Sequence, residues 1–428
     1  APAEDSAAGA DRAAAADLHV QDHVFPSGLR LIVREDSRLP MAYVAAVLGG
    51  GILAETDGQA GVSQLASDLL TRGTSRHTAA ELAELLESRA VSLASFSGRN
   101  SYGLSAAGLS EDLPLMLDTV AACLLDSQFP EDELEKQRAL QLAAIRRALE
   151  KPMTHAQQMV RDAMFPGHPY RFSTLGDPAA VAALARADVQ AHHRKLLGAS
   201  NLVLAVFGDV KKDAVVAAVA AAFADLPANP PPAWPALPPP PAAAVRTEKQ
   251  LPFKQTVLVR AWPGIASGDP REDAVSVLMD ALSGLSSDLF IEVRDKRGLA
   301  YYVGATHFTG PVGGLFTIYA GTTPEGRAEV EAQIQAQTER LRGAGVRPDE
   351  FSRAVEQLRA DQARTLQNNG AMAQQCALDE LLGLGYRHSL TTAERLQNLT
   401  PDAVRAAAET IFSSPGEAVA VVLPGDAP

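Results

Sequence analysis

Arg294 and Tyr301 stand seven residues apart in the segment LFIEVRDKRGLAYYV, residues 289–303. The apolar spacing before Gly298 predicts an amphipathic helix, and the tyrosines after it predict the start of a strand. A guanidinium leaving the last helical turn and a phenolic hydroxyl opening the strand can then point into one cleft as neighbouring hydrogen-bond donors. On the residues alone, a structural role is the simpler interpretation, because an arginine near a helix C-terminus also complements the helix dipole.

The other polar motifs favour structural roles. Residues 49–51 are three glycines after a strand pattern, but they lack the G-x-G-x-x-G spacing of a phosphate-binding loop, so a turn is the better interpretation. His192 and His193 are adjacent and point to different sides of a helix, whereas helical metal ligands need i, i+4 spacing. Cys123 and Cys376 are far apart, which excludes a disulfide framework and a cysteine-based zinc finger.

Length and composition indicate a globular protein with more than one core. The chain has 428 residues, of which 46% are hydrophobic and 21% are charged, and these values exclude a disordered chain. Its longest apolar run, residues 214–224, is well short of the ~20 residues that span a bilayer. A formal net charge of −13 repels phosphate backbones. We therefore expect neither a membrane span nor a nucleic-acid partner.

A proline-rich segment divides the chain into two similar halves. Nine of the 28 prolines lie between residues 227 and 241, and such a segment favours extended polyproline II, which is typical of a semi-rigid linker. Three markers recur at nearly constant spacing in the two halves, and helix caps alone do not produce such a series, so the spacing predicts an internal duplication. The markers are Glu133 and Glu350, 217 residues apart, Asp188 and Asp402, 214 apart, and Gly208 and Gly425, 217 apart.

Each half shows the same order of elements, with strands first and helices later. This order predicts an α+β fold of two homologous domains, each an antiparallel-rich sheet packed against helices, and not a doubly wound parallel sheet. The strands are expected at residues 41–48, 91–96, 101–107 and 202–207, and again at residues 256–261, 301–307, 314–320 and 418–423. The predicted boundaries are 1–18 for a disordered tail, 19–226 for the N-terminal domain, 227–245 for the linker and 246–428 for the C-terminal domain with Arg294 and Tyr301.

The segment 289–303 resembles the arginine–tyrosine segment of the pitrilysin/insulinase family, the inverted-zincin metallopeptidases. The resemblance covers nearly the whole chain, from about Val24 to Gly425. Members of this family carry duplicated α+β domains, in agreement with the repeat found from the residues. Further matching motifs are FPSGLR at residues 25–30, Gly61-Val62, Arg72-Gly73-Thr74, Phe129-Pro130, GHPY at residues 167–170 and Leu175-Gly176.

The zinc motif of the family is replaced in this chain. Active members carry H-x-x-E-H on the first helix, where two histidines at i, i+4 bind zinc and the glutamate acts as general base. The corresponding positions here are Gln64, Ser67 and Asp68. The third ligand of active members, a glutamate on a later helix, corresponds to Ala143-Ala144, with Ala144 taken as the ligand position. A catalytic zinc needs three protein ligands, so we expect no metal and no cofactor on this chain.

A lost zinc site beside a retained arginine and tyrosine is similar to the non-catalytic partner in heterodimeric family members, such as the alpha subunit of mitochondrial processing peptidase and bacterial two-subunit homologues. The resemblance implies a zinc-free subunit of a heterodimeric zinc metalloendopeptidase. A homologous partner subunit bearing H-x-x-E-H would supply the zinc, and the substrates would be peptides. Arg294 and Tyr301 would reach across to the partner's zinc site and stabilise the oxyanion of peptide-bond hydrolysis.

Two alternatives to this hypothesis stay open. In the first, the chain is a structural pseudo-peptidase or scaffold subunit with no catalytic contribution, although a pure scaffold has no reason to keep Arg294 and Tyr301. In the second, Asp68 and a displaced histidine bind a metal in an unfamiliar geometry. Whether the chain counts as an enzyme also stays open, because it has no zinc motif of its own.

The first residues bear on the cellular location. Residues 1–18 are rich in alanine and aspartate, show no apolar periodicity and are predicted to be a tail left after processing. An exported, periplasmic protein fits this interpretation, and a cytoplasmic protein is the other expectation.

Overall fold

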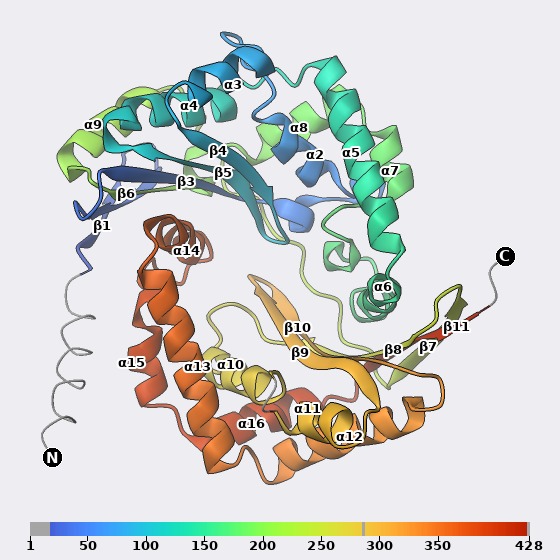
Figure 1. Ribbon diagram of the computed structural model, residues 1–428. Helices are drawn as coiled ribbons and strands as arrows, with labels where there is room; N and C mark the ends of the chain where they lie inside the picture. Colours follow the sequence, from blue (N-terminus) through green and yellow to red (C-terminus); the bar gives the residue numbers. More distant parts are fainter. Residues whose placement is uncertain (1–17, 285–286, 426–428) are drawn as a thin grey trace, which may run out of the picture. The chain divides into compact units, whose positions relative to one another are not determined.

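The computed structural model describes residues 18–284 and 287–425, and the chain forms two compact units (Figure 1). The first unit consists of the described residues up to 142, residues 174–233 and residues 362–391. The second unit consists of residues 143–173, residues 234–361 and the described residues from 392 onward. Each unit therefore includes a segment from the other half of the sequence, whereas the predicted domains are continuous. The predicted tail, except Leu18, lies outside the described residues.

The first unit contains a six-stranded sheet in the order β1-β2-β6-β3-β5-β4, with β4 as an edge strand. β2 and β6 are parallel, and all other neighbouring strands are antiparallel. The strands are β1 (Val20–Val24), β2 (Arg30–Glu35), β3 (Met41–Gly49), β4 (Ser92–Ser97), β5 (Ser101–Leu109) and β6 (Leu202–Gly208).

Both faces of this sheet are covered, because side chains alternate along each strand. One face, with Leu31 and Val44, packs against α2, α4, α8 and α9. The other face, with Ile32, Val47 and Phe207, packs against α14, which comes from the second half of the sequence (Figure 1). The helices are α2 (Val62–Leu69), α3 (Ala79–Glu87), α4 (Leu113–Leu125), α7 (Pro178–Ala183), α8 (Arg186–Leu196), α9 (Lys212–Ala222), α14 (Asn369–Leu381) and the first part of α5 (Glu131–Leu149).

The second unit contains a five-stranded sheet in the order β7-β11-β8-β10-β9. β7 and β11 are parallel and the other pairs are antiparallel. The strand order and strand directions of this sheet repeat those of β2-β6-β3-β5-β4 in the first unit. The predicted α+β fold with two homologous domains is therefore confirmed. The strands are β7 (Val245–Leu251), β8 (Thr256–Gly264), β9 (Ala300–Gly310), β10 (Gly313–Thr322) and β11 (Ala418–Pro424).

The second sheet is also covered on both faces. Leu258, Phe316 and Ile318 lie in a core with α10, α12 and α16. The opposite face, with Val257 and Val259, contacts α6 (Pro152–Met164), which comes from the first half of the sequence. The other helices are α10 (Glu272–Ala281), α11 (Asp288–Phe290), α12 (Arg327–Gly343), most of α13 (Pro348–Leu366), α15 (Thr392–Gln397) and α16 (Pro401–Phe412).

Short helices occupy several connections between these elements. A π-helix, η6 (Ile291–Asp295), directly follows α11. The 3-10 helices are η1 (Gly51–Ala54), η2 (Asp57–Gln59), η3 (Ser110–Asp112), η4 (Pro169–Arg171), η5 (Ala199–Asn201) and η7 (Ser389–Thr391). Residues 227–244, which include the proline-rich segment, contain no helix or strand.

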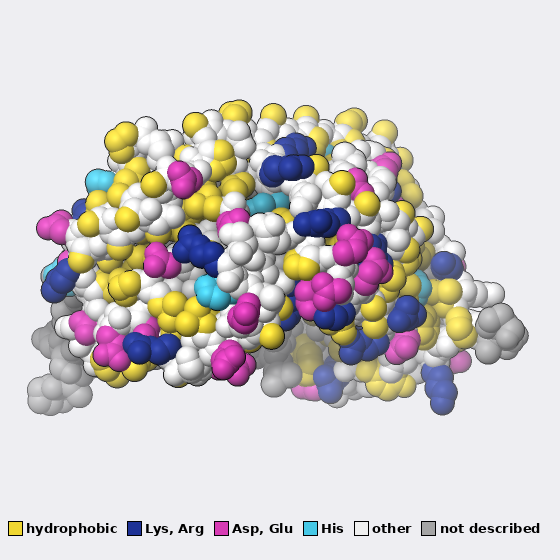
Figure 2. Space-filling model, turned by 90° about the horizontal axis from the view of Figure 1, so that it is seen from above, with side chains coloured by type: hydrophobic (Ala, Val, Ile, Leu, Met, Phe, Trp, Pro, Cys, Tyr) yellow, Lys and Arg dark blue, Asp and Glu magenta, His cyan; other side chains and the backbone are white. Residues whose placement is uncertain are grey.

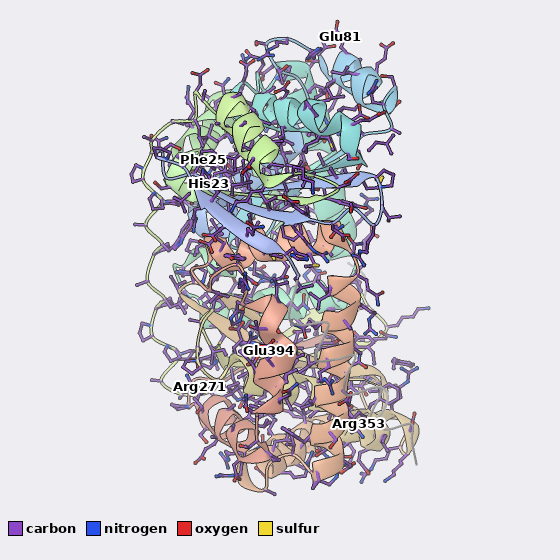
Figure 3. All side chains as sticks on the ribbon, turned by 90° about the vertical axis from the view of Figure 1, so that its left-hand side faces the viewer. His23, Phe25, Glu81, Arg271, Arg353 and Glu394 are labelled. Atoms are coloured by element: carbon purple, nitrogen blue, oxygen red, sulfur yellow. The ribbon has the colours of Figure 1, made fainter. Side chains whose placement is uncertain are left out.

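Local sequence signals set several helix starts, as α3 illustrates. Oγ1 of Thr78 accepts a hydrogen bond from the Glu81 amide at 3.3 Å, and Oε2 of Glu81 accepts one from the Thr78 amide at 2.8 Å, which forms a capping box. Glu81 is labelled in Figure 3.

Two findings concern the surface of the described residues. None of the helices within residues 18–284 and 287–425 is long and apolar enough to cross a membrane. On the face seen in Figure 2, acidic and basic side chains are interspersed. The formal charge of −13 therefore forms no single acidic patch on that face.

Candidate functional site

Helix α2 carries the three positions that correspond to the zinc motif. It begins after Gly61, whose φ of 105° is left-handed and where a Cβ would lie 2.6 Å from Cγ2 of Val181. Gln64 and Asp68 are four residues apart and partly exposed, so they share one side of the helix. Ser67 is fully buried. The helix therefore presents only the amide and the carboxylate of the three predicted positions to solvent.

Gln64 and Asp68 bind each other. Nε2 of Gln64 donates a hydrogen bond to Oδ2 of Asp68 at 3.0 Å. Burial raises the pKa of Asp68, and the hydrogen bond from Gln64 and the charge of Arg72 lower it by smaller amounts. No lysine or arginine in the described part of the chain lies within ion-pair distance of this carboxylate. Asp68 is thus a half-buried carboxylate without an ion-pair partner in the described part of the chain, although the more distant charge of Arg72 acts on it.

These residues do not fit a catalytic zinc. The amide of Gln64, which donates to a carboxylate, replaces a histidine, and the buried hydroxyl of Ser67 replaces the general base. At the third ligand position, Ala144 on α5 has only a methyl group. Catalytic zinc takes three ligands from histidine, cysteine and carboxylate side chains. Across residues 18–284 and 287–425, no group of three or more such side chains is placed to hold a metal ion. The alternative of Asp68 with a displaced histidine gains no support.

Gln141 is a residue of this region that the sequence analysis missed. It lies on α5 three residues before Ala144, and its Nε2 donates to the carbonyl oxygens of Gly61 at 3.0 Å and Leu175 at 2.7 Å. Its Oε1 is buried and has no hydrogen-bond partner within the described residues. The signal that could have found Gln141 is an amide on the buried side of an amphipathic helix, one turn before a predicted ligand position.

A buried carboxylate, Glu55, caps helix α2 and was also missed. Its Oε2 accepts a hydrogen bond from the Gly61 amide and its Oε1 accepts one from the Ser63 amide, both at 2.9 Å. Oγ of Ser63 donates to the carbonyl of Gly51 at 2.8 Å and lies 3.0 Å from Nε2 of His192 on α8. Because the hydroxyl has one proton, the histidine carries its proton on Nε2 and donates it to Ser63. His192 therefore has a structural role, as its position beside His193 had suggested.

We expect Glu55 to make stability depend on pH. Burial raises its pKa to about 7, although the bonds from Gly61 and Ser63 oppose the shift. In the unfolded chain the pKa of a glutamate is ~4.3. Between this pH and the folded pKa of about 7, the unfolded state loses the proton and the folded state keeps it. The stabilising contribution is therefore complete below pH ~4.3 and declines by up to ~1.4 kcal/mol per pH unit until the pH reaches the folded pKa.

Glu55→Gln tests this dependence, because glutamine keeps the shape and stays neutral. The free energy of unfolding of both proteins should be measured by urea denaturation from pH 5 to pH 8. The burial of His192, whose pKa is lowered to about 3, acts in the opposite direction in both proteins, so the difference between them isolates Glu55. We expect the wild-type advantage over the variant to shrink as the pH rises to 7, and a pH-independent difference would contradict the assignment.

Arg294 lies in the π-helix η6, close to the place where the sequence predicts a helix end. Its guanidinium is exposed, with Cζ 5.1 Å from the centroid of the Phe290 ring. The amide of Gly298, which has a φ of 61°, donates to the carbonyl of Arg294 at 3.0 Å. The chain therefore turns sharply after the helix and enters β9.

Tyr301 is the extra residue of a β-bulge at the start of edge strand β9. In the pairing with β10, Tyr302 lies opposite Gly321 and Ala300 lies opposite Thr322. Tyr301, between them, therefore has no partner on β10. Its side chain is 54% exposed. A bulge changes the direction of a side chain and is common beside active sites. The fold thus presents the phenol of Tyr301 to solvent instead of packing it on the sheet.

An ion-pair network holds the helical segment that precedes Arg294. Glu350, fully buried on α13, accepts hydrogen bonds from Nη1 and Nη2 of Arg340 at 3.0 and 2.9 Å. Arg347 makes a two-point pair with Asp288, the first residue of α11, including a bond from Nη2 at 2.8 Å. These pairs connect α11 to α12 and α13 and so fix the start of the segment.

Four of the predicted site residues form one local pair in each unit, and Ala144 lies on the part of α5 that belongs to the second unit. In the first unit, Gln64 and Asp68 are brought into contact. In the second unit, Arg294 and Tyr301 lie on either side of the turn at Gly298, and both are exposed. Within the described residues, no hydrogen bond joins the arginine to the tyrosine, so each remains available as a donor.

Two family models match the chain. The model described as Insulinase (Peptidase family M16) matches residues 30–178, and the model described as Peptidase M16 inactive domain matches residues 183–358. Together the two matches cover most of the chain and all of the described strands except β1 and β11.

Relatives and solved structures agree with these matches. An uncharacterized zinc protease of Streptomyces coelicolor is 29% identical over 402 residues, which cover 92% of this chain and 87% of that protein. The crystal structure of a peptidase M16 inactive domain from Pseudomonas fluorescens superposes with a TM-score of 0.88 at 24% identity, over 96% of this chain and 99% of that one. The periplasmic protease PqqL from Escherichia coli superposes with a TM-score of 0.81 at 15% identity, over 96% of this chain and 46% of PqqL.

Proposed function

Because the chain belongs to the M16 family of peptidases, we propose that it is the zinc-free subunit of a heterodimeric zinc endopeptidase. Helix α2 and Ala144 offer no zinc ligand set, and the match over residues 183–358 is to an inactive domain. A homologous partner bearing H-x-x-E-H would hold the zinc and the general base. This chain would contribute Arg294 and Tyr301 to the partner's site.

The observation that carries the proposal is the exposure of two donors that the fold does not use. Tyr301 is placed on a bulge, and Arg294 has no carboxylate partner among the described residues. The phenolic hydroxyl of Tyr301 would donate a hydrogen bond to the oxyanion of the tetrahedral intermediate. The guanidinium of Arg294 would hold the substrate carbonyl oxygen or the same oxyanion. Donors held in place for a developing charge cost no reorganisation during the reaction.

The fold also supports a peptide as the substrate. Strand β4 is an edge strand of the first sheet. An extended peptide can add to such an edge through main-chain hydrogen bonds, a mode of binding that leaves sequence preference loose. The chain aligns with less than half of PqqL, which supports an assembly completed by a second chain of similar size.

The direct test is to mix the full chain with a homologue that carries intact H-x-x-E-H and to measure peptide cleavage. We expect the mixture to cleave a quenched fluorescent peptide and each chain alone to stay near background. The chains should also co-elute in size-exclusion chromatography. If the homologue alone cleaves as fast as the mixture, this chain is a scaffold and the proposed catalytic contribution is wrong.

A further inference from the structure

Leu299 joins the helical segment that carries Arg294 to the strand that carries Tyr301. The amide of Leu299 donates a hydrogen bond to the carbonyl of Val293 in the π-helix η6 at 2.8 Å. The side chains of Leu299 and Val293 also pack in the same hydrophobic core. The end of the π-helix therefore holds Leu299 in place from one side, and its own carbonyl oxygen is left for another partner.

Thr322, at the end of strand β10, provides that partner. Oγ1 of Thr322 donates a hydrogen bond to the carbonyl oxygen of Leu299. Thr322 is fully buried, so water does not compete for this bond. A Cβ on Gly326, the residue before α12, would lie 2.8 Å from Oγ1 of Thr322, so the glycine leaves room for the hydroxyl. The bond thus connects the helical segment to the neighbouring strand.

This connection lies directly beside the bulge that exposes Tyr301. Thr322 is opposite Ala300 in the ladder, just before the bulge. Just after the bulge, Tyr302 is opposite Gly321, and a Cβ on Gly321 would lie 2.3 Å from Cζ of Tyr302. The ring of Tyr302 therefore lies across the glycine. The bulge is held on one side by the hydroxyl of Thr322 and on the other side by this ring.

The first unit provides an internal comparison. Its edge strand β4 pairs with β5 in continuous register over Ser92–Ser97. The two sheets can be matched at Gly208 and Gly425, which are markers of the internal duplication. Following the ladders from strand to strand then places Ala106 at the position of Thr322. The hydroxyl and the bulge therefore occur together in the second unit, and the matching strands of the first unit have neither.

A hydrogen-bond donor stabilises a transition state most effectively when it is held in place before the reaction. We propose that Thr322 is a positioning residue for Tyr301. Its hydroxyl fixes the Leu299 carbonyl, the fixed carbonyl maintains the bulge, and the bulge sets the direction of the phenol. The inference rests on the proposed role of Tyr301 in the partner's site, whereas the hold on the bulge is a property of this chain alone.

The hold on the bulge is tested on the full chain alone by fluorine NMR after labelling with fluorotyrosine. The resonance of Tyr301 is identified by its loss in Tyr301→Phe. Thr322→Val keeps the shape of the side chain but removes the donor to Leu299. In this variant the Tyr301 resonance should broaden or shift toward its position in the urea-unfolded chain. In Thr322→Ser, which keeps a hydroxyl, the resonance should stay at the wild-type position.

Thr256→Val is the matched control. Thr256 lies opposite Thr322 on the neighbouring strand β8 and is also fully buried. Its hydroxyl has no hydrogen-bond partner within the described residues. The control therefore makes the same chemical change in the same layer of the sheet without removing a donor from Leu299. It should leave the Tyr301 resonance unchanged.

Turnover of the mixed complex tests the consequence for the reaction. Thr322→Val should lower kcat by roughly 10- to 100-fold with little change in KM, because a small displacement of a catalytic group can cost up to about 10²-fold. Thr322→Ser should recover most of the rate, and Thr256→Val should keep it. When Thr322→Val is added to Tyr301→Phe, kcat should fall by less than about 2-fold further, because no phenolic hydroxyl is left to position.

An unchanged Tyr301 resonance in Thr322→Val, or an equal change in Thr256→Val, would overturn the inference whatever the turnover shows. A large further loss of kcat in the double variant would also overturn it, because Thr322 would then not act through Tyr301. If the resonance changes but Tyr301→Phe keeps full kcat, the hold of Thr322 on the bulge is supported and the proposed catalytic role of Tyr301 is wrong. The two proposals therefore fail on different measurements.

Discussion

Tyr301→Phe is expected to lower kcat of the mixed complex by roughly 10²–10³, because removing one oxyanion donor costs about 2.7–4 kcal/mol of transition-state stabilisation. KM should change little, because the oxyanion forms only in the transition state. The side chain is 54% exposed and its ring stays in place in the variant, so the fold should be unaffected. Steady-state kinetics on a quenched fluorescent peptide provide the measurement.

Tyr302→Phe is the matched control for this experiment. Tyr302 is the next residue on β9, is partly buried and pairs with Gly321 across the ladder. Removal of the Tyr302 hydroxyl should leave kcat unchanged. An unchanged kcat in Tyr301→Phe, or an equal loss in both variants, would remove Tyr301 from the reaction. A loss confined to KM would instead indicate a role in substrate binding.

Glu350→Ala is expected to cause the largest loss of stability, about 3 kcal/mol in the free energy of unfolding. Removing one member of a buried ion pair costs ~3–5 kcal/mol, because the other charge remains without its partner. We expect a loss at the lower end of this range, because Arg340 is partly exposed and its Nη2 still lies 3.7 Å from Oδ2 of Asp288 in the variant. Chemical denaturation followed by circular dichroism measures the effect.

Asp349→Ala is the control for Glu350. Asp349 is the neighbouring residue on α13, and its exposed carboxylate forms surface ion pairs with Arg347 and Arg353; Arg353 is labelled in Figure 3. Surface pairs contribute ~0–1 kcal/mol, so this variant should remain close to wild type. Equal effects of the two substitutions would show that burial of Glu350 does not determine its energetic importance.

The repeated fold was predictable because the closing strands are buried on both faces. β6 and β11 are therefore continuous apolar runs, each followed by the same glycine–aspartate pair. β7 was not predicted, because nearly all of its residues are exposed and VRTEKQL has no alternating apolar pattern. The packing of α6 and α14 was not predicted either. An amphipathic helix shows that it has an apolar side, but its sequence does not show which sheet that side covers.

The site was predictable only where the partners are close in sequence. The contact of Gln64 with Asp68 follows from i, i+4 spacing on a helix. The contacts of Gln141 with Gly61 and of Glu55 with the start of α2 depend on tertiary packing, and no local pattern indicates them. The bulge at Tyr301 arises from a one-residue register change that the alternation of a single strand does not reveal.

The packing of α14 on the first sheet has a consequence for biosynthesis. The strands that form this sheet are complete once β6 has been made, but Met372, Ala373 and Cys376, which cover one of its faces, are translated much later. At ~5–20 residues per second, the apolar face around Ile32 and Phe207 stays uncovered for on the order of ten to thirty seconds. We therefore expect the nascent chain to bind holdase chaperones during that interval, and a chain truncated before α14 to aggregate.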